Sequence, residues 1–186
     1  MPAFPELDSP LADPRVALRL SAERDIPEVL IAYQDDPQLH LALGEARPPS
    51  GAQLGRRAEE LEAERGAGSS LILAILAPGE DVCRGEVRVA SVDWEHRRAE
   101  LTWWVVPQLR GRGMGAAALR LASTWLIESA GLVRVALTCP PGHPAALAAA
   151  AAAGFQQEGV LRGYLPGDGQ RLDVTVLSRV RRDLAG

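Results

Sequence analysis

The hexapeptide RGRGMG, which begins at Arg110, joins an apolar run to an alanine- and leucine-rich segment. A loop with so little side chain at the start of a helix exposes free backbone N–H groups, and the helix dipole adds about half a positive charge there. Gly113, Gly115 and the small Ala116 let an anion approach the main chain, and Arg110 and Arg112 add donors at the rim. The spacing therefore predicts a phosphate site.

Three other interpretations of this loop are distinguished by the residues that each requires next to the glycines. A Walker A loop needs Lys and Ser or Thr after its last glycine, but two alanines follow Gly115. A dinucleotide-binding fingerprint is formally matched by Gly113, Gly115 and Ala118, yet the next strand ends at Cys139 without the required acidic residue. A glycine turn that only reverses the chain stays open as an alternative.

Composition narrows the class of protein around this loop. The chain has 186 residues, of which 47% are hydrophobic, enough for one domain with a core. Its net charge of −4 provides no field that would hold nucleic acid. Cys83 and Cys139 lack the spacing of a zinc site or a disulfide framework, and His40 and His96 have no ligand-like neighbours, so we expect no metal. No basic leader or membrane-length apolar run is visible, and a cytoplasmic protein is expected.

Proline and residue periodicity predict the elements before the loop. Four prolines in residues 1–14 favour an extended arm over a helix or an interior strand. Alternating apolar residues, helical stripes and turn-like breaks predict the remaining elements. These are a strand at 15–20, helices at 21–34 and 50–66, and strands at 70–76, 83–94 and 98–106.

The spacing of apolar residues changes after the loop, from a strand pattern to alternating helices and strands. A helix is predicted from Gly115 to Ser129, a β-branched strand at 132–139, and a helix from His143 to the glycine at 154, because alanine has the highest helix propensity. Two final strands, 155–165 and 170–180, are joined by the turn PGDG.

These motifs together resemble the GNAT family of N-acetyltransferases. The stretch AELTWWVVPQLRGRGMGAAAL is similar to the RimJ/RimL-like branch, and AAAGFQQEGVLRGYL and RLDVTVLSRVRRDL resemble its C-terminal hairpin. The resemblance implies an α/β (α+β) fold with a mixed, bent central sheet of about seven strands flanked by about four helices. Residues 15–186 would form one acetyltransferase domain after the arm of residues 1–14.

The resemblance also implies acetyl-CoA as cosubstrate. The strand that holds Val105 and the strand 132–139 would run side by side and then splay apart, and pantetheine would enter the opening. The backbone at Trp104 to Val106 would then hydrogen-bond the thioester carbonyl. The implied cofactor-binding residues are Val105, Val106, Arg110, Gly111, Arg112, Gly113, Met114, Gly115, Ala116 and His143.

Amine acetylation needs a proton acceptor, because an alkyl ammonium has a pKa near about 10. Glu100 is the first candidate, since it occupies the position where RimJ/RimL-like sequences carry a Glu. Strand alternation places it on one face with Thr102 and Trp104. A solvated carboxylate is the competing interpretation, and Glu86 is the second candidate base.

The chain departs from the family pattern at three positions. His143 and Ala146 stand where the family often has Asn and Ser, and Ala150 stands where many members have a tyrosine that protonates the leaving thiolate. Tyr164 is a possible substitute for that tyrosine, and core packing is its competing interpretation. His143 either contacts the pantetheine arm or simply lies at the rim of a helix.

Two functions of different class remain at this point. One is an N-acetyltransferase in which a primary amine, on a protein or peptide N-terminus or a small molecule, attacks acetyl-CoA directly. The other is a non-catalytic acyl-CoA-binding sensor or structural module. Trp94, Trp103 and Trp104 either pack in the core or wall the acceptor pocket. A homodimer is a further expectation from the resemblance.

Overall fold

Eight strands form one mixed sheet in the computed structural model, which describes residues 3–166 and 170–184. The strand order is β1-β2-β3-β4-β5-β6-β8-β7, and only β5 and β6 pair in parallel. The strands are β1 (Leu11–Ala12), β2 (Ala17–Leu20), β3 (Leu71–Leu76), β4 (Cys83–Asp93), β5 (Arg98–Val105), β6 (Arg134–Cys139), β7 (Gln156–Pro166) and β8 (Arg171–Val180).

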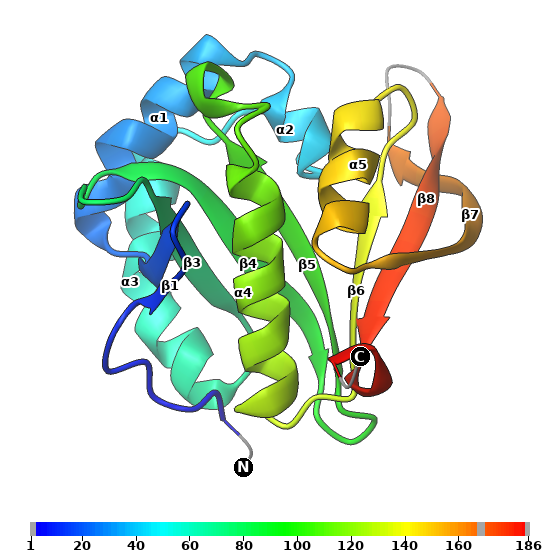
Figure 1. Cartoon of the computed structure of the whole chain (residues 1–186). Coiled ribbons are helices and arrows are strands. Elements are labelled where there is room, and N and C mark those ends of the chain that lie inside the picture. Colours follow the sequence, from blue (N-terminus) through cyan, green and yellow to red (C-terminus); the bar gives the residue numbers. More distant parts are fainter. Residues whose placement is uncertain (1–2, 167–169, 185–186) are drawn as a thin grey trace.

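Helices cover both faces of the sheet (Figure 1). Helices α4 (Met114–Glu128) and α5 (Pro144–Ala152) lie on one face, and α1 (Ile26–Asp35), α2 (Leu39–Ala42) and α3 (Gly51–Ala67) lie on the other. Each face has its own cluster of buried apolar side chains. Because both faces are covered, all six residues of β3 are buried. Three short 3-10 helices, η1 (Glu23–Asp25), η2 (Pro107–Leu109) and η3 (Arg181–Leu184), complete the fold.

Local sequence explains where the helices start. Ser50 caps α3 by accepting a hydrogen bond from the Gln53 N–H, and the Gln53 side chain accepts one from the Ser50 N–H in return. Pro144 occupies the first position of α5, where a missing N–H costs nothing. These helices therefore start within one residue of the predicted starts at Ser50 and His143.

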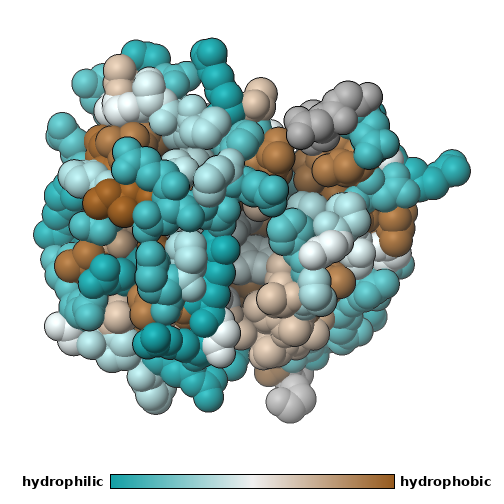
Figure 2. All heavy atoms as spheres, turned by 90° about the horizontal axis from the view of Figure 1, so that it is seen from above, coloured by the Kyte–Doolittle hydropathy of each residue, from teal (hydrophilic) through white to brown (hydrophobic). Residues whose placement is uncertain are grey.

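The parallel strands β5 and β6 diverge as the sequence predicts. Their pairing is limited to Arg98–Leu101 of β5 and Arg134–Leu137 of β6. Beyond that point β5 continues to Val105 against β4, whereas β6 continues to Cys139 against β8. Figure 2 looks down on this end and shows a hollow between the side that carries α1 and the side that carries α5. Both α4 and α5 begin at the same end (Figure 1).

The element count differs slightly from the sequence expectation. The eighth strand is β1, a two-residue edge strand inside the predicted arm, and α2 is a single turn too short to show a helical period. Phe4 is also buried, with its ring 5.4 Å from Trp94 and 6.4 Å from Trp125. Residues 167–169 of the predicted PGDG turn lie outside the described residues. None of the helices in the described ranges is long and apolar enough to span a membrane.

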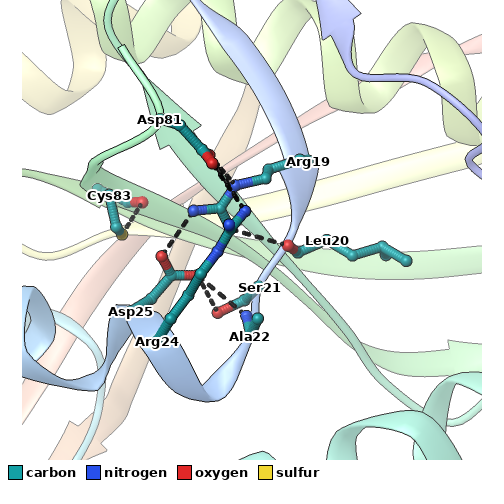
Figure 3. A network of polar contacts seen from close by, with 9 residues as sticks. Arg19, Leu20, Ser21, Ala22, Arg24, Asp25, Asp81 and Cys83 are labelled. Carbon is teal, nitrogen blue, oxygen red and sulfur yellow. Dashed lines mark hydrogen bonds and ion pairs between the residues drawn. The ribbon is translucent and has the colours of Figure 1, made fainter.

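A polar cluster ties β2 to the start of α1 (Figure 3). Arg19 donates two hydrogen bonds to Asp25, of 2.8 and 2.7 Å, and a third of 2.6 Å to Asp81 in the turn before β4. Asp25 is only 3% exposed and also accepts from the Ala22 N–H. Burial by itself would raise the pKa of Asp25, but these hydrogen bonds outweigh it and lower the pKa below its usual value.

Candidate active site

The glycine loop ends in an uncapped helix N-terminus. Gly113 is the N-cap of α4 with a φ of 80° and has no side chain to occupy the first turn. The first helical hydrogen bond runs from the Ala117 N–H to the Gly113 carbonyl, at 3.0 Å. Within residues 3–166 and 170–184, the N–H groups of Met114, Gly115 and Ala116 have no hydrogen-bond partner. Three donors thus point toward the end where β5 and β6 diverge.

The two arginines of the loop differ in their engagement. Arg110 donates from Nε to the Val105 carbonyl, at 2.9 Å, and pairs with Asp36 after α1. Arg112 is exposed. Arg110 therefore holds the loop onto β5 and α1, whereas the sequence predicted it as a free donor at the rim. Met114 contributes only main chain to the loop surface, because its side chain is buried in the core.

The free edge of β5 is defined by which N–H groups already have partners. Val106 donates its N–H to the Arg84 carbonyl on the β4 side, at 2.9 Å. Hydrogen-bonding direction alternates along a strand, so Val105 and Trp103 face the opposite edge, toward the opening. The Val106 N–H is therefore occupied. An incoming extended chain would meet the main-chain groups of Trp103 and the N–H of Val105, whose carbonyl already accepts from Arg110.

Two glycines allow close packing at this edge. A Cβ on Gly85 would lie 2.2 Å from the Trp104 carbonyl oxygen, so β4 reaches β5 here only because the side chain is absent. A Cβ on Gly115 would lie 3.3 Å from the Trp103 indole nitrogen. Trp103 thus lies beneath the first turn of α4, while Trp104 is 3% exposed and packs on the opposite face.

A cavity of about 490 Å³ lies on the α3 face of the sheet. One wall comes from α3 and the other from β3, β4 and β5. The lining residues are Leu43, Gln53, Arg56, Arg57, Glu60, Glu64, Ser70, Ile72, Arg88, Val89, Ala90 and Thr102. Its volume suits a small molecule or the first residues of a peptide.

Arg88 anchors a polar network in the wall of this cavity. Its guanidinium binds Glu45 at 2.9 Å and Glu86 at 2.8 Å, and Tyr33 donates to Glu45 at 2.6 Å. The Trp104 indole N–H donates to Glu86 at 2.9 Å. Burial by itself would lower the pKa of Arg88, but the neighbouring Glu86, Tyr33 and Glu45 raise it above its usual value. Burial has the opposite effect on Tyr33, whose pKa it raises to about 12.

The two candidate bases occupy different environments on this face. Glu100 pairs with Ala90 of β4 and Ala136 of β6, so it precedes the point of divergence, and its side chain is exposed. Glu86 pairs with Trp104, closer to the opening, but it is 4% exposed and bound to Arg88. Glu100 is not a lining residue of the cavity, although its neighbours Ala90 and Thr102 are.

The remaining site candidates lie at the same end. His143 is exposed as the N-cap of α5, and its carbonyl accepts from the Ala146 N–H. Tyr164 is 40% exposed on the edge strand β7, and its carbonyl accepts from Arg171. Ala150 is fully buried in the core, so a tyrosine would not fit at this position.

Sequence reasoning singled out Glu86 and Trp104 but missed Arg88, Tyr33 and Glu45. Tyr33 and Glu45 come from different elements, and Glu45 lies 43 residues from Arg88. No local spacing signals such a long-range ion pair. In the described part of the chain, no group of three or more His, Cys, Asp or Glu residues is arranged to hold a metal ion.

Comparison with known proteins agrees with this geometry. Residues 15–156 match the family model described as an acetyltransferase (GNAT) domain. YdaF of Bacillus subtilis, which carries a provisional name as a ribosomal N-acetyltransferase, is 29% identical over 102 residues. That match covers 55% of this chain and 56% of YdaF, so the chain aligns with about half the length of this relative.

Two solved structures share the fold. Mycobacterium smegmatis RimJ in complex with CoA-disulfide superposes with a TM-score of 0.82 at 26% identity, over 96% of this chain and 88% of RimJ. Spermidine N-acetyltransferase from Vibrio cholerae, in complex with CoA and spermine, gives 0.80 at 17% identity, over 94% and 100%. Because the family model matches about three quarters of the sequence, the chain belongs to the GNAT family of acetyltransferases.

Proposed function

We propose that this protein is an acetyl-CoA-dependent N-acetyltransferase that transfers acetyl to a primary amine by direct attack in a ternary complex. The observation that carries this proposal is the set of three unpaired N–H groups, at Met114, Gly115 and Ala116, beside the opening between β5 and β6. A phosphate bound by these groups places the attached chain directly along the free edge of β5.

The residues at this end fit an acyl-CoA. The main chain of residues 111–116 holds the pyrophosphate, with Arg112 at the rim. A pantetheine amide pairs with the main chain of Trp103 at this free edge as an added strand would, which leaves the Val105 N–H for the thioester. His143, exposed at the start of α5, faces the same end and contacts the pantetheine arm. Acetyl-CoA supplies the acetyl thioester when bound.

The state of the two cysteines supports direct attack over transfer through a cysteine. An acyl-enzyme on cysteine needs a thiolate, but burial raises the pKa of Cys83 to about 12 and that of Cys139 to about 11. Both thiols are therefore neutral near pH 7. The amine nitrogen attacks the thioester carbon itself, and the Val105 N–H stabilises the oxyanion that forms.

The proton of the amine leaves toward Glu100. About five residues of extended strand separate Glu100 from Val105, or roughly 16 Å, so the transfer runs through water. Glu86 is nearer, but it is already bound by Arg88 and Trp104. Tyr164 is the candidate that returns a proton to the leaving thiolate, because it is exposed on the hairpin at this end.

The acceptor enters from the cavity beneath α3. Names of the similar proteins point to ribosomal proteins and to spermidine, both of which present a primary amine. The cavity carries basic and acidic side chains from α3, including Arg56 and Glu64. The cavity would accept either a peptide N-terminus or a small-molecule amine.

The experiment compares Glu100→Gln with Glu86→Gln by CoA thiol release against pH. Glu100→Gln should lower turnover by about 10² to 10⁴ at neutral pH. The loss should shrink as pH rises, because more amine arrives neutral, and CoA affinity should stay unchanged. Equal turnover of wild type and Glu100→Gln near pH 7 would remove Glu100 from the mechanism. A pH-dependent loss in Glu86→Gln alone would transfer the role to Glu86.

A non-catalytic acyl-CoA-binding module is the second candidate. It is favoured by Ala150, which is fully buried where many family members have an acid for the leaving thiolate. Such a module would bind CoA without releasing thiol in the presence of any amine. Thiol release from acetyl-CoA with a panel of ribosomal-protein N-terminal peptides and polyamines therefore separates the two functions.

A further inference from the structure

The segment before β2 runs along the face of α4 that begins at Gly113. Arg120 lies seven residues after Gly113, which is about two helical turns, so the two share one face. Arg120 pairs with Asp13 at 2.9 Å. Asp13 also accepts hydrogen bonds from the N–H groups of Arg15 and Val16, at 2.7 and 3.1 Å. Asp13 thus fixes a tight turn against α4.

This turn places the Arg15 side chain beside the glycine loop. A Cβ on Gly113 would lie 3.6 Å from Arg15 Cδ and 3.8 Å from both Nε and Nη1. Arg15 is exposed, and its guanidinium has no hydrogen-bond or ion-pair partner among residues 3–166 and 170–184. Arg110, by contrast, is bound to the Val105 carbonyl and Asp36.

The position of Arg15 is electrostatically unfavourable in the free protein. The N-terminus of α4 carries a partial positive charge and three unpaired N–H groups, and a guanidinium beside it adds a like charge. An anion between the two would satisfy both. This observation points to a ligand with negative charge, and it is independent of the family match.

We propose that Arg15 binds the pyrophosphate of acyl-CoA, with Asp13 as its positioning residue. The proposal rests on the proposed function and adds a contact from outside the glycine loop. Arg15 then supplies the side-chain contact to the phosphate that the sequence predicted for Arg110, because Arg110 is bound to the Val105 carbonyl and Asp36. The guanidinium and the main chain of α4 enclose the anion from two sides.

The test is calorimetric titration of CoA into the wild type, Arg15→Gln and Arg15→Lys. Arg182→Gln is the matched control, because it removes an exposed charge from η3, at the other end of α4 (Figure 1). Arg15→Gln should weaken CoA binding about tenfold, the loss expected for one charge-assisted hydrogen bond. Arg15→Lys should restore part of it, and the control should match the wild type.

Further titrations locate the contact. Pantetheine, which lacks phosphates, should bind wild type and Arg15→Gln equally, and 3′-dephospho-CoA should show the same loss as CoA. The dependence of log affinity on log salt should be less steep in Arg15→Gln. Asp13→Asn should weaken CoA binding in the wild type but add nothing in Arg15→Gln, because it acts through Arg15.

The outcomes separate this proposal from the proposed function. If wild type and Arg15→Gln bind CoA equally, Arg15 has no role, although CoA still binds and the proposed function stands. A loss with CoA that disappears with 3′-dephospho-CoA would overturn the assignment to the pyrophosphate. If the wild type does not bind CoA at all, the proposed function itself fails.

Discussion

Two arginine-centred networks on this protein use similar chemistry for different purposes. Arg19 binds Asp25, six residues away, and joins β2 to the start of α1 (Figure 3). Arg88 binds Glu45, 43 residues away, and lies in the wall of the 490 Å³ cavity. Both arginine side chains are 13% exposed. The two arginines are therefore equally exposed, but their partners are not: the Asp81 side chain is 58% exposed, against 18% for Glu45 and 5% for Glu86.

The difference separates fold stability from acceptor binding. Arg19 and its partners are absent from the cavity lining, so their hydrogen bonds stabilise only the junction of β2, α1 and the turn at Asp81. Arg88 connects the loop after α2 to β4 and presents its side chain to the cavity. Its network therefore fixes the shape of the wall that we propose for acceptor binding, and variants in the two networks should have separable effects.

The largest expected effect is on stability, from Arg19→Met. It leaves Asp25, which is 3% exposed, as a buried carboxylate without its cation. Loss of one partner of a buried ion pair costs about 3 to 5 kcal/mol. Urea unfolding measures this loss, and the KM values for acetyl-CoA and amine should stay at wild-type levels. A stable Arg19→Met protein with an altered amine KM would show that the Arg19 network serves amine binding and not fold stability.

Glu45→Gln should show the opposite pattern. It keeps the shape of the side chain but removes the charge that binds Arg88 and Arg57. We expect the amine KM to rise about tenfold, because a weakened charged hydrogen bond is worth about 1.5 to 3 kcal/mol. Asp81→Asn, on the exposed partner of Arg19, is the control and should leave the amine KM unchanged. Unchanged kinetics in both variants would show that the cavity wall does not contact the acceptor.

The smallest effect concerns acid stability. The pKa of Asp25 lies below its usual value in the folded protein, so its charged form stabilises the fold. That contribution is complete above about pH 4, the unfolded pKa, and is lost as pH falls through the folded pKa. Asp25→Asn should flatten the stability profile of the wild type below about pH 4. Parallel profiles for the two proteins would contradict the assignment.

The sequence was most informative where structure is local. Strand alternation predicted that Glu100 shares a face with Trp104, and the register of β4 and β5 confirms it. The glycines before Met114 predicted the helix start within one residue. These features depend on periodicity and backbone freedom, which a short segment contains in full.

Features that depend on distant partners were not predictable from spacing. The Val106 N–H is occupied by Arg84, and Arg110 is occupied by Asp36, 74 residues away. Arg15 lies beside the glycine loop next to a turn at Asp13, which is bound by Arg120, 107 residues further along the chain. Side chains recruited across the fold obey no sequence period, so only the structure identifies them.

Ligand binding at the glycine loop tests the central claim most directly. Gly113→Val fills the space beside the free N–H groups of α4, and Gly131→Val is the matched control. Gly131 follows the other end of α4 with a similar φ of 76°, against 80° at Gly113, and nothing lies near its Cβ position. Both variants should lose stability from backbone strain.

Calorimetric titration of CoA into the three proteins, with urea unfolding in its presence, is the decisive measurement. Wild type and Gly131→Val should bind CoA and gain about 2.7 kcal/mol of stability at a hundredfold excess over Kd. Folded Gly113→Val should show neither binding nor stabilisation. Wild-type CoA affinity in folded Gly113→Val would contradict the placement of the cofactor at the start of α4.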